Sequence, residues 1–132
     1  MANVLYPKGK EAILAGDVHL DSDTIKVALI DTGTSSYNSA HDFLNDISAG
    51  VVGTAVALGS KTITNGVFDS ADPTWSAVSG STVEAIVMYV DSGSAATSQL
   101  IAWYDTGITG LPLTPNGGDV TYTVHASGWF AL

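Results

Sequence analysis

Two strongly apolar segments constrain the fold of this chain more than any other feature. Residues 83–91 read VEAIVMYVD and residues 98–105 read SQLIAWYD. In an extended chain, both segments place apolar side chains on both faces, so both faces must be covered by protein. The loop between them, SGSAAT, is small and polar. We therefore predict an antiparallel hairpin of two central strands, with one face in a core and the other in a second layer or a subunit interface.

Further strands are expected on both sides of this hairpin. Residues 24–31 place Ile25, Val27 and Leu29 on one side, and residues 51–58 contain Gly53 as a possible bulge. Asn65-Gly66 is a two-residue hairpin signal. A short strand is expected to begin at Pro73, where a missing N–H is tolerated.

The segment from residue 119 to 125, DVTYTVH, alternates apolar and polar residues. Such alternation predicts a strand with one buried face. The inward set is Val120, Tyr122 and Val124, and the outward set is Thr121, Thr123 and His125. The preceding Asn116–Asp119 run, NGGD, has no following Lys-Ser/Thr and opens no helix, so it predicts a turn and not a phosphate-binding loop.

Two short helices are expected. Residues 7–15 have Pro7 in the first turn and Gly16 just past the end, although Gly9 weakens the pattern. In residues 39–47, SAHDFLNDI, Ser39 is a possible N-cap and the helix has at most two turns. Together these patterns predict a mainly β fold, an antiparallel β-sandwich or barrel with one or two short helices. We expect a single β-rich domain over residues 1–132, with residues 1–6 as a possible N-terminal arm.

The charge balance limits the classes of partner that the chain is expected to bind. Thirteen Asp and Glu residues oppose four Lys, and Arg is absent, which gives a net charge of −9. This excess disfavours nucleic acid and anionic membrane surfaces, because both are bound through cationic side chains. It favours solubility or a basic partner surface. Cysteine is absent, and the N-terminal residues lack a signal-peptide pattern, so we expect synthesis and use in the cytoplasm or in a particle assembled there.

Catalytic signatures are weak. No Gly-x-Ser-x-Gly motif occurs, and three scattered histidines, His19, His41 and His125, define no triad. Glu84 lies in the most apolar strand, and is the acid most worth examining for a shifted pKa, but a solvent or interface position is favoured. We predict a protein that is not an enzyme and needs no cofactor.

The acidic segment DVHLDSD holds the calcium candidates Asp17, Asp21 and Asp23, which alternate with other residues around His19. Carboxylate oxygens on one face of a strand suit Ca²⁺. However, the 12-residue calcium-loop pattern with its late Glu is absent, and a solvated acidic turn is favoured. Asp69 and Asp72 form a weaker version of the same pattern. No His/Cys spacing suits Zn²⁺, so no metal is predicted.

Aromatic residues near the chain end suggest a surface role. Trp129 and Phe130 are difficult for a monomer to bury so close to a terminus, and aromatic residues are common anchors of protein interfaces. Exposed tryptophans can alternatively stack on sugars. Trp75, Trp103 or Trp129 would then be exposed over a sugar face in a carbohydrate- or receptor-binding β module at a tail or fibre.

Several segments resemble, in order along nearly the whole chain, a family of small structural proteins of tailed bacteriophages. They are LYPKGKEAILAGDVHLDSDTIKVALID, HDFLNDI, GVFDSADPTWSAVSG, EAIVMYVDSG and LIAWYDTGITGLPLTPNGGDVTYTV. The resemblance implies a β-rich, non-enzymatic virion component, most similar to a capsid decoration (cement) protein. Such a protein is made in the host cytoplasm, binds the major capsid protein on the capsid exterior and self-associates as a homotrimer.

Contacts with the partner are expected at both ends of the chain. The N-terminal candidates are Val4, Leu5 and Tyr6, and the C-terminal candidates are Trp129 and Phe130. Deletion of residues 1–6 is expected to weaken docking while the domain still folds.

Overall fold

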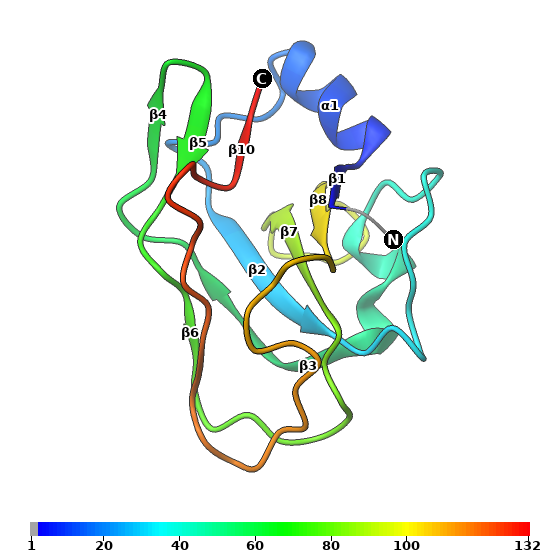
Figure 1. Ribbon diagram of the computed structural model, residues 1–132. Helices are drawn as coiled ribbons and strands as arrows, with labels where there is room; N and C mark the ends of the chain where they lie inside the picture. Colours follow the sequence, from blue (N-terminus) through cyan, green and yellow to red (C-terminus); the bar gives the residue numbers. More distant parts are fainter. Residues whose placement is uncertain (1–2) are drawn as a thin grey trace.

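The structure is a computed structural model, and it describes residues 3–132 (Figure 1). The elements, in chain order, are β1 (Val4–Leu5), α1 (Pro7–Leu14), β2 (Ile25–Ile30), the 3₁₀ turns η1 (Leu44–Asp46) and η2 (Ser48–Gly50), β3 (Val51–Ala57), β4 (Thr62–Thr64), β5 (Val67–Asp69), β6 (Thr74–Trp75), β7 (Ala85–Val90), β8 (Leu100–Tyr104), β9 (Val120–Thr121) and β10 (Phe130–Ala131).

A five-stranded antiparallel sheet forms the centre of the fold, in the order β1-β8-β7-β2-β3. The predicted hairpin of two apolar strands is confirmed, because β7 pairs antiparallel with β8. Every residue of β8 is buried, as are the first five residues of β7. Protein therefore covers both faces of these strands, as the sequence predicted.

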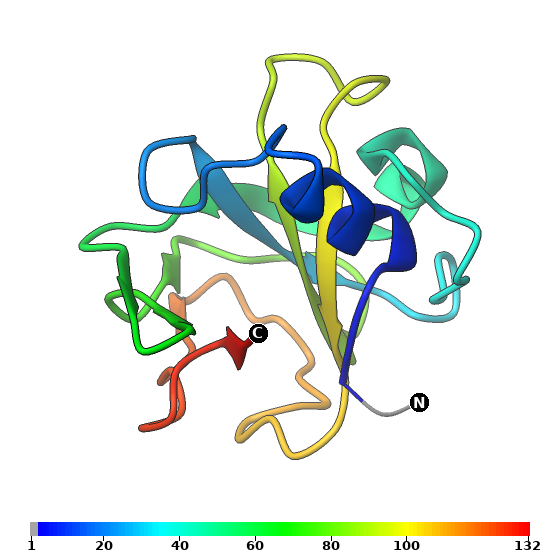
Figure 2. The same cartoon turned by 90° about the horizontal axis from the view of Figure 1, so that it is seen from above.

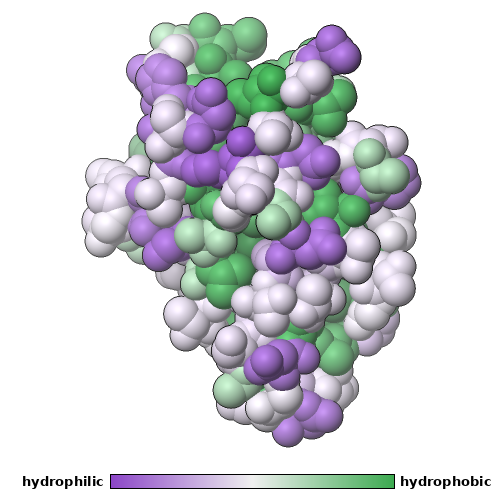
Figure 3. All heavy atoms as spheres, turned by 90° about the vertical axis from the view of Figure 1, so that its left-hand side faces the viewer, coloured by the Kyte–Doolittle hydropathy of each residue, from purple (hydrophilic) through white to green (hydrophobic). Residues whose placement is uncertain are grey.

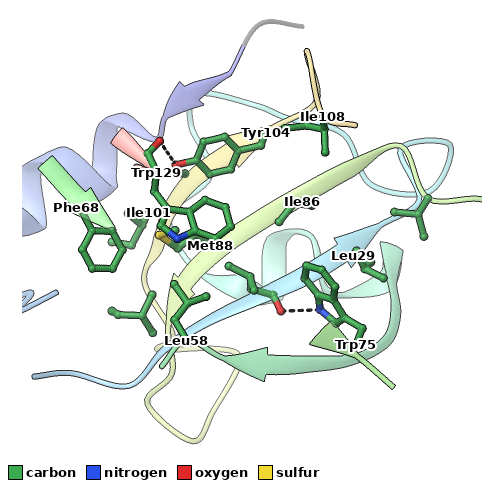
Figure 4. Packing of buried hydrophobic residues seen from close by; sticks show 14 of the residues in the cluster. Leu29, Leu58, Phe68, Trp75, Ile86, Met88, Ile101, Tyr104, Ile108 and Trp129 are labelled. Atoms are coloured by element: carbon green, nitrogen blue, oxygen red, sulfur yellow. Dashed lines mark hydrogen bonds between the residues drawn. The ribbon is translucent and has the colours of Figure 1, made fainter. Parts of the chain in front are cut away.

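One face of the main sheet packs against a second β layer. The three-stranded sheet β10-β5-β4, the β6–β9 ribbon and α1 cover this face. Ile25, Val27 and Leu29 of β2 point into this core, as predicted. Trp75 donates its Nε1–H to the carbonyl of Val27 at 3.1 Å and so fastens the two layers together (Figure 4).

The opposite face is covered by the segment from residue 31 to 50, together with Tyr6 (Figure 2). The prediction of a helix over residues 39–47 is wrong, and Ser39 is not a helix N-cap. Phe43 is extended and forms a β-bridge with Gln99, while the N–H of Leu44 donates to the carbonyl of Ser98. Pairing with residues 98–99, just before β8, thus overrides the local helical pattern, and only the 3₁₀ turn η1 remains within residues 39–47.

The fold class predicted from the sequence is confirmed as a mainly β, sandwich-like arrangement. Within residues 3–132 the main sheet does not close into a barrel, because β1 and β3 are its free edges. The Asn65-Gly66 hairpin is also confirmed: both residues have positive φ, 52° and 79°, and join β4 to β5. Gly53 (φ 73°) lies in β3 where the pairing with β2 shifts register, as a bulge requires.

The helix over the first residues is confirmed as α1, which begins at Pro7 and is followed by Gly16 in the left-handed region (φ 82°). Gly9 is buried inside it, against β8. A Cβ at this position would lie 2.5 Å from the carbonyl oxygen of Leu100. Glycine therefore weakens the local helical preference but permits close packing of α1 on the main sheet.

Candidate interaction surface

The N-terminal residues do not form the free arm expected from the sequence. Val4 and Leu5 pair with β8, and the side chain of Tyr6 is fully buried. The carboxamide oxygen of Asn3 accepts from the N–H groups of Asp105 (2.8 Å) and Thr106 (2.9 Å). Residues 1–2 of the expected arm lie outside the described residues. Residues 3–6 are thus part of the fold, and Tyr6 cannot serve as an exposed contact.

The C-terminal aromatic residues are also integrated into the monomer, contrary to expectation. Trp129 is buried, with its ring centroid 5.3 Å from those of Tyr104 and Tyr122. Its Nε1–H donates to the Ser70 hydroxyl at 2.8 Å. Phe130 is half-buried and packs on Phe68. Both aromatic side chains therefore pack within the monomer, and Figure 4 shows Trp129 beside Tyr104 among the buried residues.

The tryptophans offer no sugar-stacking platform. Trp75 and Trp103 are each 1% exposed, and Trp129 is 6% exposed. The indole N–H of Trp103 donates to Asp105 Oδ2 at 2.9 Å. The observation that would favour a carbohydrate-binding module is therefore missing from all three positions.

The calcium candidates lie on an exposed segment leading to β2. Asp17 and Asp21 are exposed and Asp23 is half-buried, whereas Val18 and Leu20 between them are buried in the core. Asp23 Oδ2 accepts from the backbone N–H of His19 at 2.7 Å and closes a local turn. Among residues 3–132, no group of three or more acidic, His or Cys side chains is arranged to hold a metal. The segment forms an exposed acidic turn that is anchored by the buried side chains of Val18 and Leu20.

Glu84 lies just before β7, half-buried, and shares the lining of a shallow pocket with Asp105. Its Oε1 accepts from the N–H and the hydroxyl of Thr32, at 3.2 and 3.4 Å. Asp105 accepts from the Thr106 hydroxyl as well as from Trp103. Both carboxylates thus serve as acceptors that fix loops at this end of the main sheet.

The segment from Asn116 to Val124 has a structural role, as a turn followed by a short strand. Gly117 has φ 89°, and the Asp119 carboxylate accepts from the N–H of Ala77 at 3.0 Å. The predicted alternation holds: Val120, Tyr122 and Val124 are half-buried and pack on the core, whereas Thr121, Thr123 and His125 are exposed. The regular strand is shorter than predicted, because β9 covers only Val120–Thr121.

An apolar groove of about 320 Å³ remains on the surface, between α1, the acidic turn and the second β layer. It is not one of the sites predicted from the sequence. Its apolar walls are Ile13, Val18, Leu20, Ile63, Phe68, Phe130 and Leu132, with His19, Asp21 and Gly66 completing the lining. Of the interface candidates expected from the sequence, Phe130 alone lines this groove.

Large apolar side chains are exposed around the groove. Ile63 is 51% exposed and Leu132 is 66% exposed, and both line it; Leu14, 85% exposed, follows the lining residue Ile13 at the end of α1. These are the large apolar side chains that the described residues leave exposed. Hydrophobic atoms gather accordingly at the top of Figure 3, the end of the molecule where Figure 1 places the β4–β5 turn, the C-terminus and the end of α1. Clustering of this kind is typical of interaction sites.

A free strand edge borders the same groove. β4 is the outermost strand of the β10-β5-β4 sheet, and all three of its residues are exposed. Natural edge strands are usually protected by charges, proline or a covering segment. The β4 residues Thr62, Ile63 and Thr64 carry no charge, so this edge is open to pairing.

Leu132 forms part of the groove wall and is held there by a backbone hydrogen bond. The N–H of Leu132 donates to the carbonyl of Gly66 at 2.9 Å, which holds the terminus against the β4–β5 turn. A Cβ on Gly66 would lie 2.7 Å from the Leu132 carbonyl oxygen. Glycine is therefore required here by close backbone approach as well as by its φ of 79°.

Comparison with known proteins gives no relative: no protein-family model matches the chain, and no curated protein matches it. The resemblance to phage structural proteins therefore rests on the sequence segments alone. In the part of the chain that the structure describes, no helix is long and apolar enough to cross a membrane.

Sequence reasoning missed the groove because its walls come from distant segments. One signal was available: the alternation of Val18 and Leu20 with exposed acids shows a strand-like segment with a buried face. Ile63 was a second signal of an apolar surface. It lies between two threonines in a short hairpin arm, and an arm of this length leaves its side chain difficult to bury.

Proposed function

We propose that this chain is a structural protein of a bacteriophage virion, a capsid decoration protein that docks on the outer shell and stabilises the head. It would bind the major capsid protein and associate with itself as a trimer. The resemblance along nearly the whole sequence suggests this class of protein. The surface around the groove gives the proposal its physical support.

The observation that carries the proposal is the coincidence of an apolar groove, exposed Ile63 and Leu132, and the free edge of β4 at one end of the molecule. The large aromatic residues are otherwise used inside the fold, where they fasten the layers to one another. A docking protein needs a rigid body with a small adhesive surface. Contacts at such a surface can be weak individually, because many copies around a shell multiply them.

The charge is consistent with docking on a basic partner. A net charge of −9 favours solubility, and it favours encounter with a positively charged surface. We therefore expect attachment to weaken as the ionic strength rises, since screening shortens the range of these interactions.

Mass spectrometry of purified, extensively washed particles of the encoding phage tests the proposal. We expect the chain to be present in many copies per particle, and to be released by high salt before the shell breaks. Particles that lack the chain, together with a protein that remains a soluble monomer, would contradict the proposed function.

A further inference from the structure

We propose that the groove and the edge of β4 together bind an extended, basic segment of a partner protein, which adds to β4 as a further strand. This inference rests on the proposed function in one respect, that the chain acts by docking on another protein. It specifies how the docking surface works and what chemistry the partner must have.

The geometry of the β4–β5 hairpin exposes the backbone of Ile63. The loop between the strands has two residues, and Thr64 pairs with Val67, Ile63 with Phe68. In such a hairpin, the residues that flank the loop exchange hydrogen bonds, so the next pair points its N–H and C=O groups outward. The N–H and C=O of Ile63 are therefore available to an added strand.

The groove adds apolar burial to the few backbone hydrogen bonds that the short edge of β4 can form. A three-residue strand offers few backbone hydrogen bonds, so binding by pairing alone would be weak. A strand added beside β4 places alternate side chains toward the sheet face. On that side lies the groove of about 320 Å³, whose walls include Ile63, Phe68, Phe130 and Leu132. Apolar side chains of the added segment would be buried there.

Charge selects a basic partner over a second copy of the chain. The acidic turn beside the groove carries Asp17, Asp21 and Asp23, and the nearby Lys61 amine is already bonded to the carbonyl of Asp23. Two copies docked through this surface would bring these carboxylates together between bodies that each carry −9. Lys or Arg residues flanking an apolar segment would instead face the carboxylates and complement them.

A peptide pool tests the inference directly. The probe consists of peptides about ten residues long, with a core of Thr alternating with Val, Ile, Leu or Phe and two Lys at each end. A matched pool carries Glu in place of Lys. Titration into the isotopically labelled full chain, followed by amide chemical shifts, shows both where and how tightly each pool binds.

Two substitutions at one position separate backbone pairing from side-chain burial. Ile63→Pro removes the outward N–H without removing a hydrogen bond to β5, a position where edge strands tolerate proline. Ile63→Val keeps the N–H and a β-branched side chain. We expect Ile63→Pro to weaken the Lys pool by about tenfold or more and Ile63→Val by much less. Leu132→Ser is a second variant that leaves β4 unchanged and should weaken binding by removing part of the groove wall.

The outcomes are distinct. Shifts confined to β4 and to the residues that line the groove, from Ile13, 18–21, the β4–β5 hairpin and residues 130–132, with the Lys pool tighter than the Glu pool, support the inference. Equal binding of the two pools, shifts elsewhere, or no binding by either pool would overturn it. Concentration-dependent dimers abolished by Ile63→Pro would also overturn it, since the occupant would then be a second copy. If neither peptide pool binds but washed particles retain the chain, the strand-addition inference is wrong and the proposed function stands. If the Lys pool binds but the chain is absent from washed particles, the virion role is wrong and the inference about the groove stands.

Discussion

The hydroxyl of Tyr104 donates a hydrogen bond to the backbone carbonyl of Trp129 at 3.0 Å, and the two rings lie 5.3 Å apart. Tyr104 ends β8 of the main sheet, while Trp129 directly precedes β10 of the second layer. This contact therefore joins the two layers at a point where both groups are buried. It also explains why a tryptophan so near the terminus is not free to contact a partner.

Removing that hydroxyl should cost stability. Tyr104→Phe leaves the Trp129 carbonyl buried without this donor, so we expect the free energy of unfolding to fall by about 1–3 kcal/mol. Urea denaturation measures the change. Tyr37→Phe is the control, because Tyr37 is half-buried and no hydrogen bond of its hydroxyl is found among residues 3–132. Equal effects of the two substitutions would contradict the importance of the interlayer bond.

Tyr6, unlike Tyr104, has a buried hydroxyl without a bonding partner. Tyr6 is fully buried, and its hydroxyl has no hydrogen-bond partner within the described structure. Tyr6→Phe should therefore be neutral or stabilising by about 1 kcal/mol, because it removes an unsatisfied polar atom. Tyr6→Ala should destabilise by about 3–5 kcal/mol through the cavity that it leaves. Thermal denaturation of both variants checks this, and a marked loss on Tyr6→Phe would show that the hydroxyl has a partner.

The burial of Tyr6 also changes the result expected for deletion of residues 1–6. The sequence led to the expectation that the domain would fold without them, but the deletion removes β1, uncovers β8 and takes away Tyr6. We now expect the truncated chain to lose its cooperative thermal transition or to melt far below the full chain. A truncated protein with an unchanged melting temperature would restore the N-terminal arm as an independent segment.

Gly9 should be intolerant of even a methyl group. Alanine favours helix in general, yet a Cβ here would lie 2.5 Å from the Leu100 carbonyl oxygen. We expect Gly9→Ala to reduce the free energy of unfolding by about 1–3 kcal/mol through overpacking. Gly59→Ala is the control, because a Cβ at position 59 meets no atom within 4 Å. Chemical denaturation should separate the two variants, and a stabilising Gly9→Ala would contradict the close packing of α1 on β8.

Stability should fall in alkaline solution. Burial raises the pKa values of Tyr6, Tyr89, Tyr104 and Tyr122 above the ordinary tyrosine value. Below about pH 10 these phenols are protonated in both folded and unfolded chains, so their contribution is fully present. As the pH rises further, the unfolded chain loses these protons first, and the folded state loses stability up to the folded pKa values. Denaturation followed together with tyrosinate absorbance should show ionisation coupled to unfolding; early ionisation of all tyrosines without unfolding would contradict their burial.

The strands were predictable from the sequence where local pattern and tertiary packing agree. The apolar segments that became β7 and β8, and the Asn65-Gly66 turn, carry their own signals in residue type. The stretch around Phe43 was not predictable, because its helical spacing lost to pairing with Gln99, a residue far away in the chain. Tertiary pairing of this kind leaves no local signal.

The ends of the chain were misjudged for a related reason. Proximity to a terminus suggested exposure, but Trp129 fills a gap between layers that only the assembled fold creates. The groove follows the same logic: Leu20, Phe68 and Leu132 meet only after the second layer closes over the main sheet. The composition favoured solubility or a basic partner surface, whereas the position of the groove and of the β4 edge could be found only from the three-dimensional arrangement.

Electron microscopy of the native particle, at a resolution that shows side chains, tests the central claim most directly. The expected result is density for this chain on the outer shell, with the groove and the edge of β4 against a basic, extended segment of the capsid protein. A particle in which the chain is absent, or in which Ile63 and Leu132 face solvent, would contradict it.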